Sequence, residues 1–271
     1  MHRISVASDA PVLVLAIPGS AASTAIGSLD ADIADQIAEA AAESCPGVEI
    51  RIGYLAGDVD GLVDALNFDR GEPDELSGLT DPTAAPQAVV VPLLAGSHPT
   101  LDRQLATVMS EVAAPVMLGS HLGPHPLLAG ALHDRLSEVG LARASRARGL
   151  NISAGANGVL VLADRGQQAI NDAGVTAVLL AARLAVPAVP ASLGDTASIK
   201  SALDRLREAG ASHPAIAPCL IGPETDPAEL TALSSAIDAP CAAPLGAHPA
   251  IAQLVAIRYG EALARISVPS R

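Results

Sequence analysis

Aromatic residues are almost missing from this 271-residue chain, which contains two Tyr, one Phe and no Trp. Proteins that bind single-stranded nucleic acid stack the bases on aromatic side chains, so this shortage argues against that function. The formal net charge of −13 argues in the same direction, because nucleic acids and anionic membranes attract basic proteins. We therefore expect neither a nucleic-acid partner nor a membrane partner.

Cysteines and long apolar runs are also scarce. The three cysteines form no Cys-x-x-Cys pair and show no metal-ligand spacing, which is typical of a reduced, cytoplasmic protein. No apolar stretch approaches the roughly 20 residues that a membrane helix needs. The apolar run at residues 11–17 is short, and we interpret it as a first strand and not as a signal peptide.

What the chain does contain is an internal repeat. Residues 87–136 and 214–263 both show an apolar run, a turn, a polar helix, a short strand after Ala-Pro, and then Leu-Gly-x-His-Pro before another helix. The openings of the two halves, residues 11–20 and 158–167, match as well. Strands that alternate with helices predict parallel sheets covered on both faces. We predict an α/β fold of two tandem, homologous, flavodoxin-like domains: an N-terminal domain at 1–143, a linker at 144–157 and a C-terminal domain at 158–271.

Hydrophobic patterns predict the elements of the first half in more detail. A continuous apolar run such as 88–94 is typical of a strand inside a parallel sheet. We expect strands at 11–17, 48–55, 88–94 and 114–120, and helices at 58–68, 99–112 and 125–140. The acidic segment 69–86 is rich in Pro and Gly and predicts a surface loop. Arg143, Arg146 and Arg148 fall in the linker region, where they either face solvent or contact an anion.

The strand and turn at 11–20, the His-bearing loop after 88–94 and the paired Leu-Gly-x-His-Pro turns resemble the sirohydrochlorin chelatases in their long, two-domain bacterial form. The resemblance implies a lyase-class enzyme that inserts cobalt or ferrous iron into sirohydrochlorin, for cobalamin or siroheme biosynthesis. The divalent metal ion would be a substrate, with a tetrapyrrole as the second substrate and no organic cofactor. A monomer and a homodimer both remain open.

One departure from the family affects the expected chemistry. The family opens with Ala-His-Gly-Ser, whose His is catalytic or binds metal, whereas this chain has Pro18 at that place and, by sequence alignment, Arg165 in its second half. Proline has no side-chain lone pair, so it can act neither as a base nor as a ligand. An alternative function is therefore a degenerate or recruited chelatase-fold protein that binds a tetrapyrrole or metal, or performs other metal-dependent cofactor or natural-product chemistry.

His98 is the main candidate for catalysis. Metal insertion requires a base for two pyrrole protons and a metal ligand that can let go, and imidazole suits both roles. The resemblance implies that His98 is this base and metal ligand; a turn cap is the alternative. Asp102 either orients His98 or is an ordinary acid in the first turn of a helix. His121 follows the fourth strand and is either a second metal ligand or an exposed loop residue.

The remaining polar candidates have structural alternatives. The amides of Gly19 and Ser20 either hold an anionic group of the substrate or form a plain turn. Glu224 and Asp226 are either cleft carboxylates or a helix start. The resemblance and the topology together predict a cleft between the halves, lined by Ser20, His98, Asp102 and His121.

Two pairs of histidines receive structural assignments. His125 and His248 occur in both copies of the Leu-Gly-x-His-Pro turn, so we expect them to cap helices or tie loops. We expect His133 and His213 on the surface.

Overall fold

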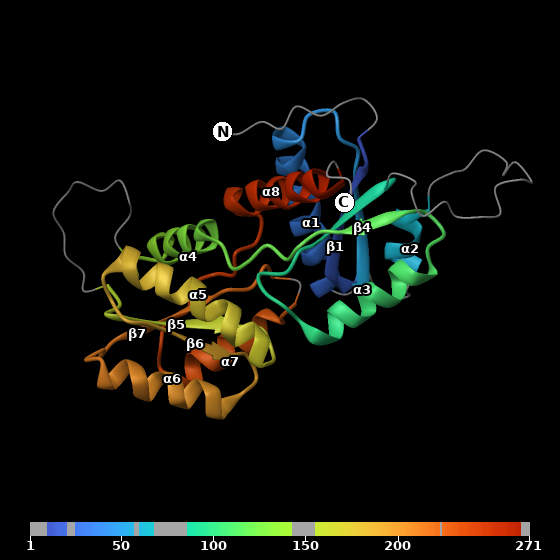
Figure 1. Ribbon diagram of the computed structural model, residues 1–271. Helices are drawn as coiled ribbons and strands as arrows, with labels where there is room; N and C mark the ends of the chain where they lie inside the picture. Colours follow the sequence, from blue (N-terminus) through green and yellow to red (C-terminus); the bar gives the residue numbers. More distant parts are fainter. Residues whose placement is uncertain are drawn as a thin grey trace, which may run out of the picture. The chain divides into compact units, whose positions relative to one another are not determined.

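A computed structural model describes residues 10–20, 25–56, 60–67, 86–142, 155–222 and 224–266. Figure 1 shows the expected alternation of strands and helices along the chain. The strands are β1 (Val12–Ser20), β2 (Ile50–Ala56), β3 (Ala88–Pro92), β4 (Val116–Leu118), β5 (Gly158–Ala163), β6 (Ala188–Ser192) and β7 (Pro214–Pro218). The helices are α1 (Ala25–Ser44), α2 (Asp60–Leu66), α3 (Pro99–Glu111), α4 (Pro126–Glu138), α5 (Gln167–Leu184), α6 (Thr196–Glu208), α7 (Pro227–Ile237) and α8 (Pro249–Ile266).

These residues form two parallel sheets flanked by helices, which confirms the predicted fold class. Within the described ranges, one sheet has the order β2-β1-β3-β4 and the other the order β6-β5-β7. In the second sheet a single parallel bridge between Ile216 and Cys241 stands where the first sheet has its fourth strand. In both sheets the first strand of the repeat, β1 or β5, is an interior strand with a neighbour on each side. Its apolar run is buried on both faces, as expected of a doubly covered parallel sheet.

The compact units of the structure are discontinuous in sequence. One unit contains Met1–Leu93, Thr100–His121 and Ala252–Arg271, and the other contains Leu94–Pro99 and Leu122–Ile251. Helix α4 thus belongs to the second unit although it closes the first repeat, and most of α8 belongs to the first unit although it closes the second repeat. The short loop Leu94–Pro99, which carries His98, also belongs to the second unit. The boundary at 143 and 158 stays a prediction about the repeats.

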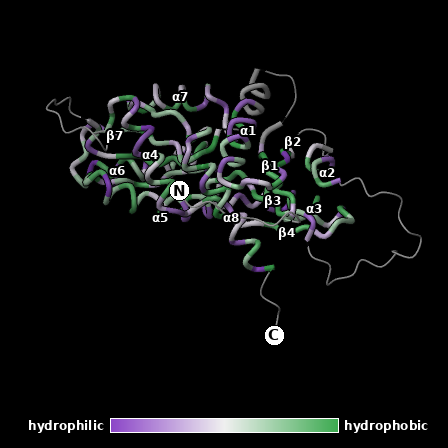
Figure 2. Tube along the Cα trace, turned by 90° about the horizontal axis from the view of Figure 1, so that it is seen from above, coloured by the Kyte–Doolittle hydropathy of each residue, from purple (hydrophilic) through white to green (hydrophobic). Residues whose placement is uncertain are grey.

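In the first unit, an apolar cluster joins the sheet to α2 and α3 through residues that include Val14, Leu62 and Leu105. Helix α8 is tied to the start of β1, because the buried Tyr259 donates its hydroxyl hydrogen to the carbonyl oxygen of Pro11 at 2.6 Å. Burial raises the pKa of Tyr259 to about 12, so the phenol stays a donor. Figure 2 shows hydrophobic colour along the strands of this unit.

In the second unit, α4 and α5 pack against each other, and α6 and α7 cover the other side of the sheet with a core that includes Leu160, Leu203 and Leu230 (Figure 1). His133 lies in α4 and is only 5% exposed, so the predicted surface position was wrong. The reason is its helical spacing from Ala129 and Leu136, which puts it on the buried face. His213 is exposed, as predicted.

No helix in the described part of the chain is both long and apolar enough to span a membrane. The acidic segment 69–86 and the linker arginines lie outside the described residues, apart from Pro86.

Candidate active site

The two Leu-Gly-x-His-Pro turns hold the chain in the same way in both repeats. Leu122 donates its amide hydrogen to the carbonyl of Leu94, and Leu245 donates to Leu220. The following histidines cap α4 and α8: each Nδ1 accepts an amide hydrogen at 3.1 Å, at His125 from Leu127 and at His248 from Ala250. The predicted capping role of both histidines is confirmed.

The first of these turns also supports the loop that carries His98. A Cβ atom at Gly123 would collide with the carbonyl oxygen of Ala95, so only glycine permits this approach. Asp172 on α5 holds the same loop from another side, because its Oδ2 accepts the amide hydrogen of Ser97 at 2.9 Å. The backbone next to His98 is thus fixed by two independent contacts.

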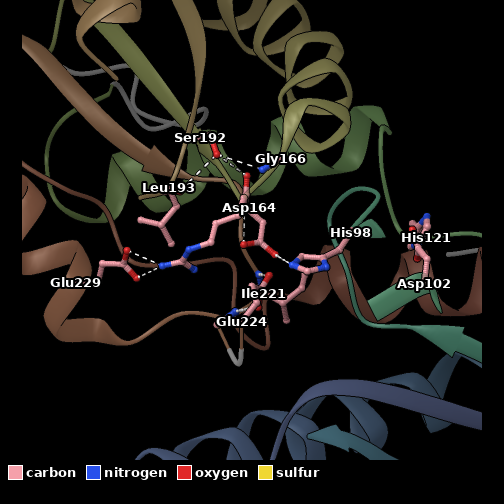
Figure 3. Close-up of polar contacts among 12 residues, drawn as sticks. His98, Asp102, His121, Asp164, Gly166, Ser192, Leu193, Ile221, Glu224 and Glu229 are labelled. Atoms are coloured by element: carbon pink, nitrogen blue, oxygen red, sulfur yellow. Dashed lines mark hydrogen bonds and ion pairs between the residues drawn. The ribbon is translucent and has the colours of Figure 1, made fainter. Parts of the chain in front are cut away.

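His98 lies beside a carboxylate that the sequence did not indicate. Its Nε2 is 3.4 Å from Oδ2 of Asp164, and the two side chains are 20% and 12% exposed (Figure 3). Burial raises the pKa of Asp164, while the backbone amide of Arg165 and the nearby His98 and Arg165 charges lower it in part. Both residues belong to the second unit.

The first strands of the two repeats can be aligned by their hydrogen bonds. The carbonyl of Ala16 accepts from Leu93 in the first repeat, and that of Leu162 accepts from Cys219 in the second. This register equates Ala16 with Leu162, which differs by one residue from the alignment of the two sequences. The register ends before Pro18, because the pairing of β1 with β2 is irregular between Ile17 and Ser20. Arg165 forms an ion pair with Glu229, in which its Nη2 atom donates to both carboxylate oxygens, at 2.7 and 2.9 Å.

Glu224 and Asp164 line the same small pocket. Gly96 and Cys219 also line this narrow pocket. Both carboxylate oxygens of Glu224 accept backbone amide hydrogens, one from Ile221 and one from Gly222. Burial nevertheless raises the pKa of Glu224 to about 7. Glu224 is therefore a carboxylate of this pocket. Asp226 is the N-cap of α7, and its side chain accepts the amide hydrogen of Ala228.

Asp102 has a different imidazole partner from the one expected. Its Oδ1 lies 2.7 Å from Nε2 of His121, within the first unit (Figure 3). His121 is thus a half-buried, hydrogen-bonded residue. The backbone of Gly19 and Ser20 continues β1 and does not form a turn, and Ser20 pairs with Ala56. The anion-binding role of Gly19 and Ser20, and the cleft between the halves, stay predictions.

Within the described ranges, no three His, Cys, Asp or Glu side chains gather closely enough to hold a metal ion. The His98–Asp164 and His121–Asp102 pairs each supply one nitrogen and one carboxylate. An arrangement of this kind can take up protons or bind an ion loosely.

Comparison with known proteins identifies the fold. No protein-family model and no curated sequence matches the chain. Among solved structures, it is similar to the cobalt complex of the sirohydrochlorin chelatase SirB from Bacillus subtilis subspecies spizizenii, with a TM-score of 0.61, 15% identity, and coverage of 94% of this chain and 96% of SirB. SirB from Bacillus subtilis with Fe³⁺ gives a TM-score of 0.61 at 18% identity, again over 94% and 96% of the two chains.

The same fold occurs in CbiX, the terminal enzyme for biosynthesis of siroheme in denitrifying bacteria. CbiX matches with a TM-score of 0.58 and 16% identity, over 93% of this chain and 99% of CbiX. The chain therefore has the chelatase fold along nearly its whole length.

Proposed function

We propose that this protein inserts a divalent metal ion, cobalt or ferrous iron, into sirohydrochlorin or a related tetrapyrrole. The observation that carries the proposal is the chelatase fold over nearly the whole chain, with few residues left over in either partner of the comparison. A fold can serve several functions, so the side chains at the strand ends must also suit the reaction. The free thiols of all three cysteines agree with the predicted cytoplasmic location.

The chemistry of insertion requires two pyrrole N–H protons to leave as the metal enters. His98 is a half-buried imidazole, a side chain that can act as a base for one proton. Glu224, with its pKa raised by burial to about 7, can accept another near neutral pH. His98 follows β3 and Glu224 follows β7, at the carboxyl ends of strands where open α/β sheets bind their ligands.

The test is to mix the purified protein with sirohydrochlorin and Co²⁺ or Fe²⁺ and to follow the visible spectrum against a protein-free reaction. We expect faster insertion with protein, and a loss of about 10²–10⁴-fold in the His98→Ala variant. His213→Ala is the matched control, because His213 is an exposed histidine that precedes β7 and so does not lie at the carboxyl end of a strand. A wild-type rate equal to the protein-free rate would contradict the proposal.

A second function is favoured by one observation, the buried Pro18 within the last residues of β1. A proline there supplies neither base nor ligand, which suits a protein that binds a tetrapyrrole or a metal without turnover. The same spectra distinguish the two functions. A shifted tetrapyrrole spectrum on adding protein, without any acceleration of metal insertion, would support the carrier.

A further inference from the structure

We propose that Asp164 is a metal ligand, and that its carboxylate and the imidazole of His98 together form an open, two-residue site for a divalent cation of the cobalt or iron class. The inference deepens the proposed function, because it rests on a metal substrate entering this part of the fold. It assigns a role to a residue of the second repeat.

The distance between the two side chains fits coordination better than it fits a hydrogen bond. An N–H···O bond is best at about 2.7–3.2 Å, and the 2.7 Å contact between His121 and Asp102 is of that kind. His98 and Asp164 are 3.4 Å apart. Two ligands that each lie about 2.1 Å from a tetrahedral ion are separated by about 3.4 Å. An ion about 2.1 Å from each atom, to one side of the line that joins them, can therefore bind both at their present separation.

Both ligands are held in place by their neighbours. The Oδ1 atom of Asp164 accepts the amide hydrogen of Arg165 at 2.7 Å, which leaves Oδ2 facing the imidazole. On the other side, Asp172 fixes the amide of Ser97, next to His98. Such second contacts orient metal ligands and typically change metal affinity by about 10–100-fold.

The surroundings provide a weak hold on a cation. Asp164 and Glu224 bring two carboxyl groups to one pocket. The guanidinium of Arg165 pairs with Glu229, and its charge also acts on Asp164, which weakens the attraction. Imidazole and carboxylate suit divalent first-row metals. With only two protein ligands, the other coordination positions stay free for water or for the nitrogens of a macrocycle. A metal that must be handed over needs a site of this kind.

Asp164 directly follows β5, the first strand of the second repeat. The loop with His98 belongs to the same compact unit as Asp164.

The experiment measures the binding of Co²⁺ alone to the full chain by equilibrium dialysis and visible absorption. We compare the wild type with His98→Ala and Asp164→Asn. The matched controls are His213→Ala, at an exposed histidine, and Asp204→Asn, at a partly exposed aspartate that pairs with Arg207. We expect each site variant to raise the Kd at least about tenfold, and both controls to bind like the wild type. Wild-type affinity in Asp164→Asn would overturn the proposal.

A second measurement does not depend on how the variants fold. Anomalous diffraction from wild-type crystals soaked in Co²⁺ should place the ion about 2.0–2.2 Å from His98 Nε2 and Asp164 Oδ2. An ion found only at other residues would overturn the site.

The insertion assay on the same proteins separates this inference from the proposed function. Cobalt bound at His98 and Asp164 without any insertion would support the site and contradict the function. Insertion at the wild-type rate in Asp164→Asn would support the function and contradict the site.

Discussion

Glu224 should make the stability of the fold depend on pH in the neutral range. Burial raises its pKa from 4.5 to about 7, although backbone amides, among them those of Ile221 and Gly222, lower it in part. A carboxyl group whose pKa is higher in the folded state stabilises the fold while it is protonated. Its contribution is therefore complete below its unfolded pKa of about 4.5 and is lost as the pH rises through about 7.

The size of this effect follows from the change in pKa. The whole rise corresponds to about 3 kcal/mol. Glu224 keeps some contact with solvent, and we therefore expect about half of this value, about 1–2 kcal/mol. Glu224→Gln removes the charge but leaves one of the two amide donors unpaired, because an amide nitrogen cannot accept, and this costs about 1 kcal/mol at every pH. The variant should thus be less stable than the wild type in acid and as stable or more stable in mild alkali.

Urea unfolding of both proteins, in the presence of a chelator, at pH values from about 5 to about 8 provides the measurement. Glu208→Gln, on the exposed surface of α6, is the matched control. A constant difference in unfolding free energy between the wild type and Glu224→Gln across this range would refute the reasoning.

Three further predictions concern stability, each measured by urea unfolding. Gly123→Ala should destabilise the fold by about 1–3 kcal/mol, since the new methyl group meets the carbonyl of Ala95. Gly130→Ala lies in α4 with open space around it, so it should raise the unfolding free energy by about 0.5–1 kcal/mol. Equal changes in the two variants would contradict this contrast. Asp195→Ala removes a cap that serves two amides of α6 and should cost about 1 kcal/mol; no loss would mean that water replaces the cap. Tyr259→Phe loses a hydrogen bond to the backbone and should cost about 1 kcal/mol, while an unchanged midpoint would show that the bond is unimportant.

The elements of the first half could be predicted from sequence because each carries a local signal. The apolar run at 88–94 predicts a buried strand, and β3 lies inside it. The helix predicted at 125–140 is α4, and His125 caps it as expected. Capping depends on residues two or three positions away, so the repeat of the same motif at His248 predicts the same role.

The His98–Asp164 pair could not be predicted in this way. The two residues are far apart in the chain and come from different repeats, so no spacing connects them. His98 follows β3 and Asp164 follows β5, and only the fold brings these two strand ends together.

The repeats and the compact units divide the chain differently, and this difference is what places the candidate site. A duplicated sequence suggests two self-contained domains with matching strand ends. In the structure the loop of His98, which follows β3 of the first repeat, is counted with the second unit, together with α4. The imidazole of one repeat is thereby brought to the first strand end of the other. The candidate site thus joins a loop of one repeat to a strand end of the other, and neither repeat alone contains both side chains.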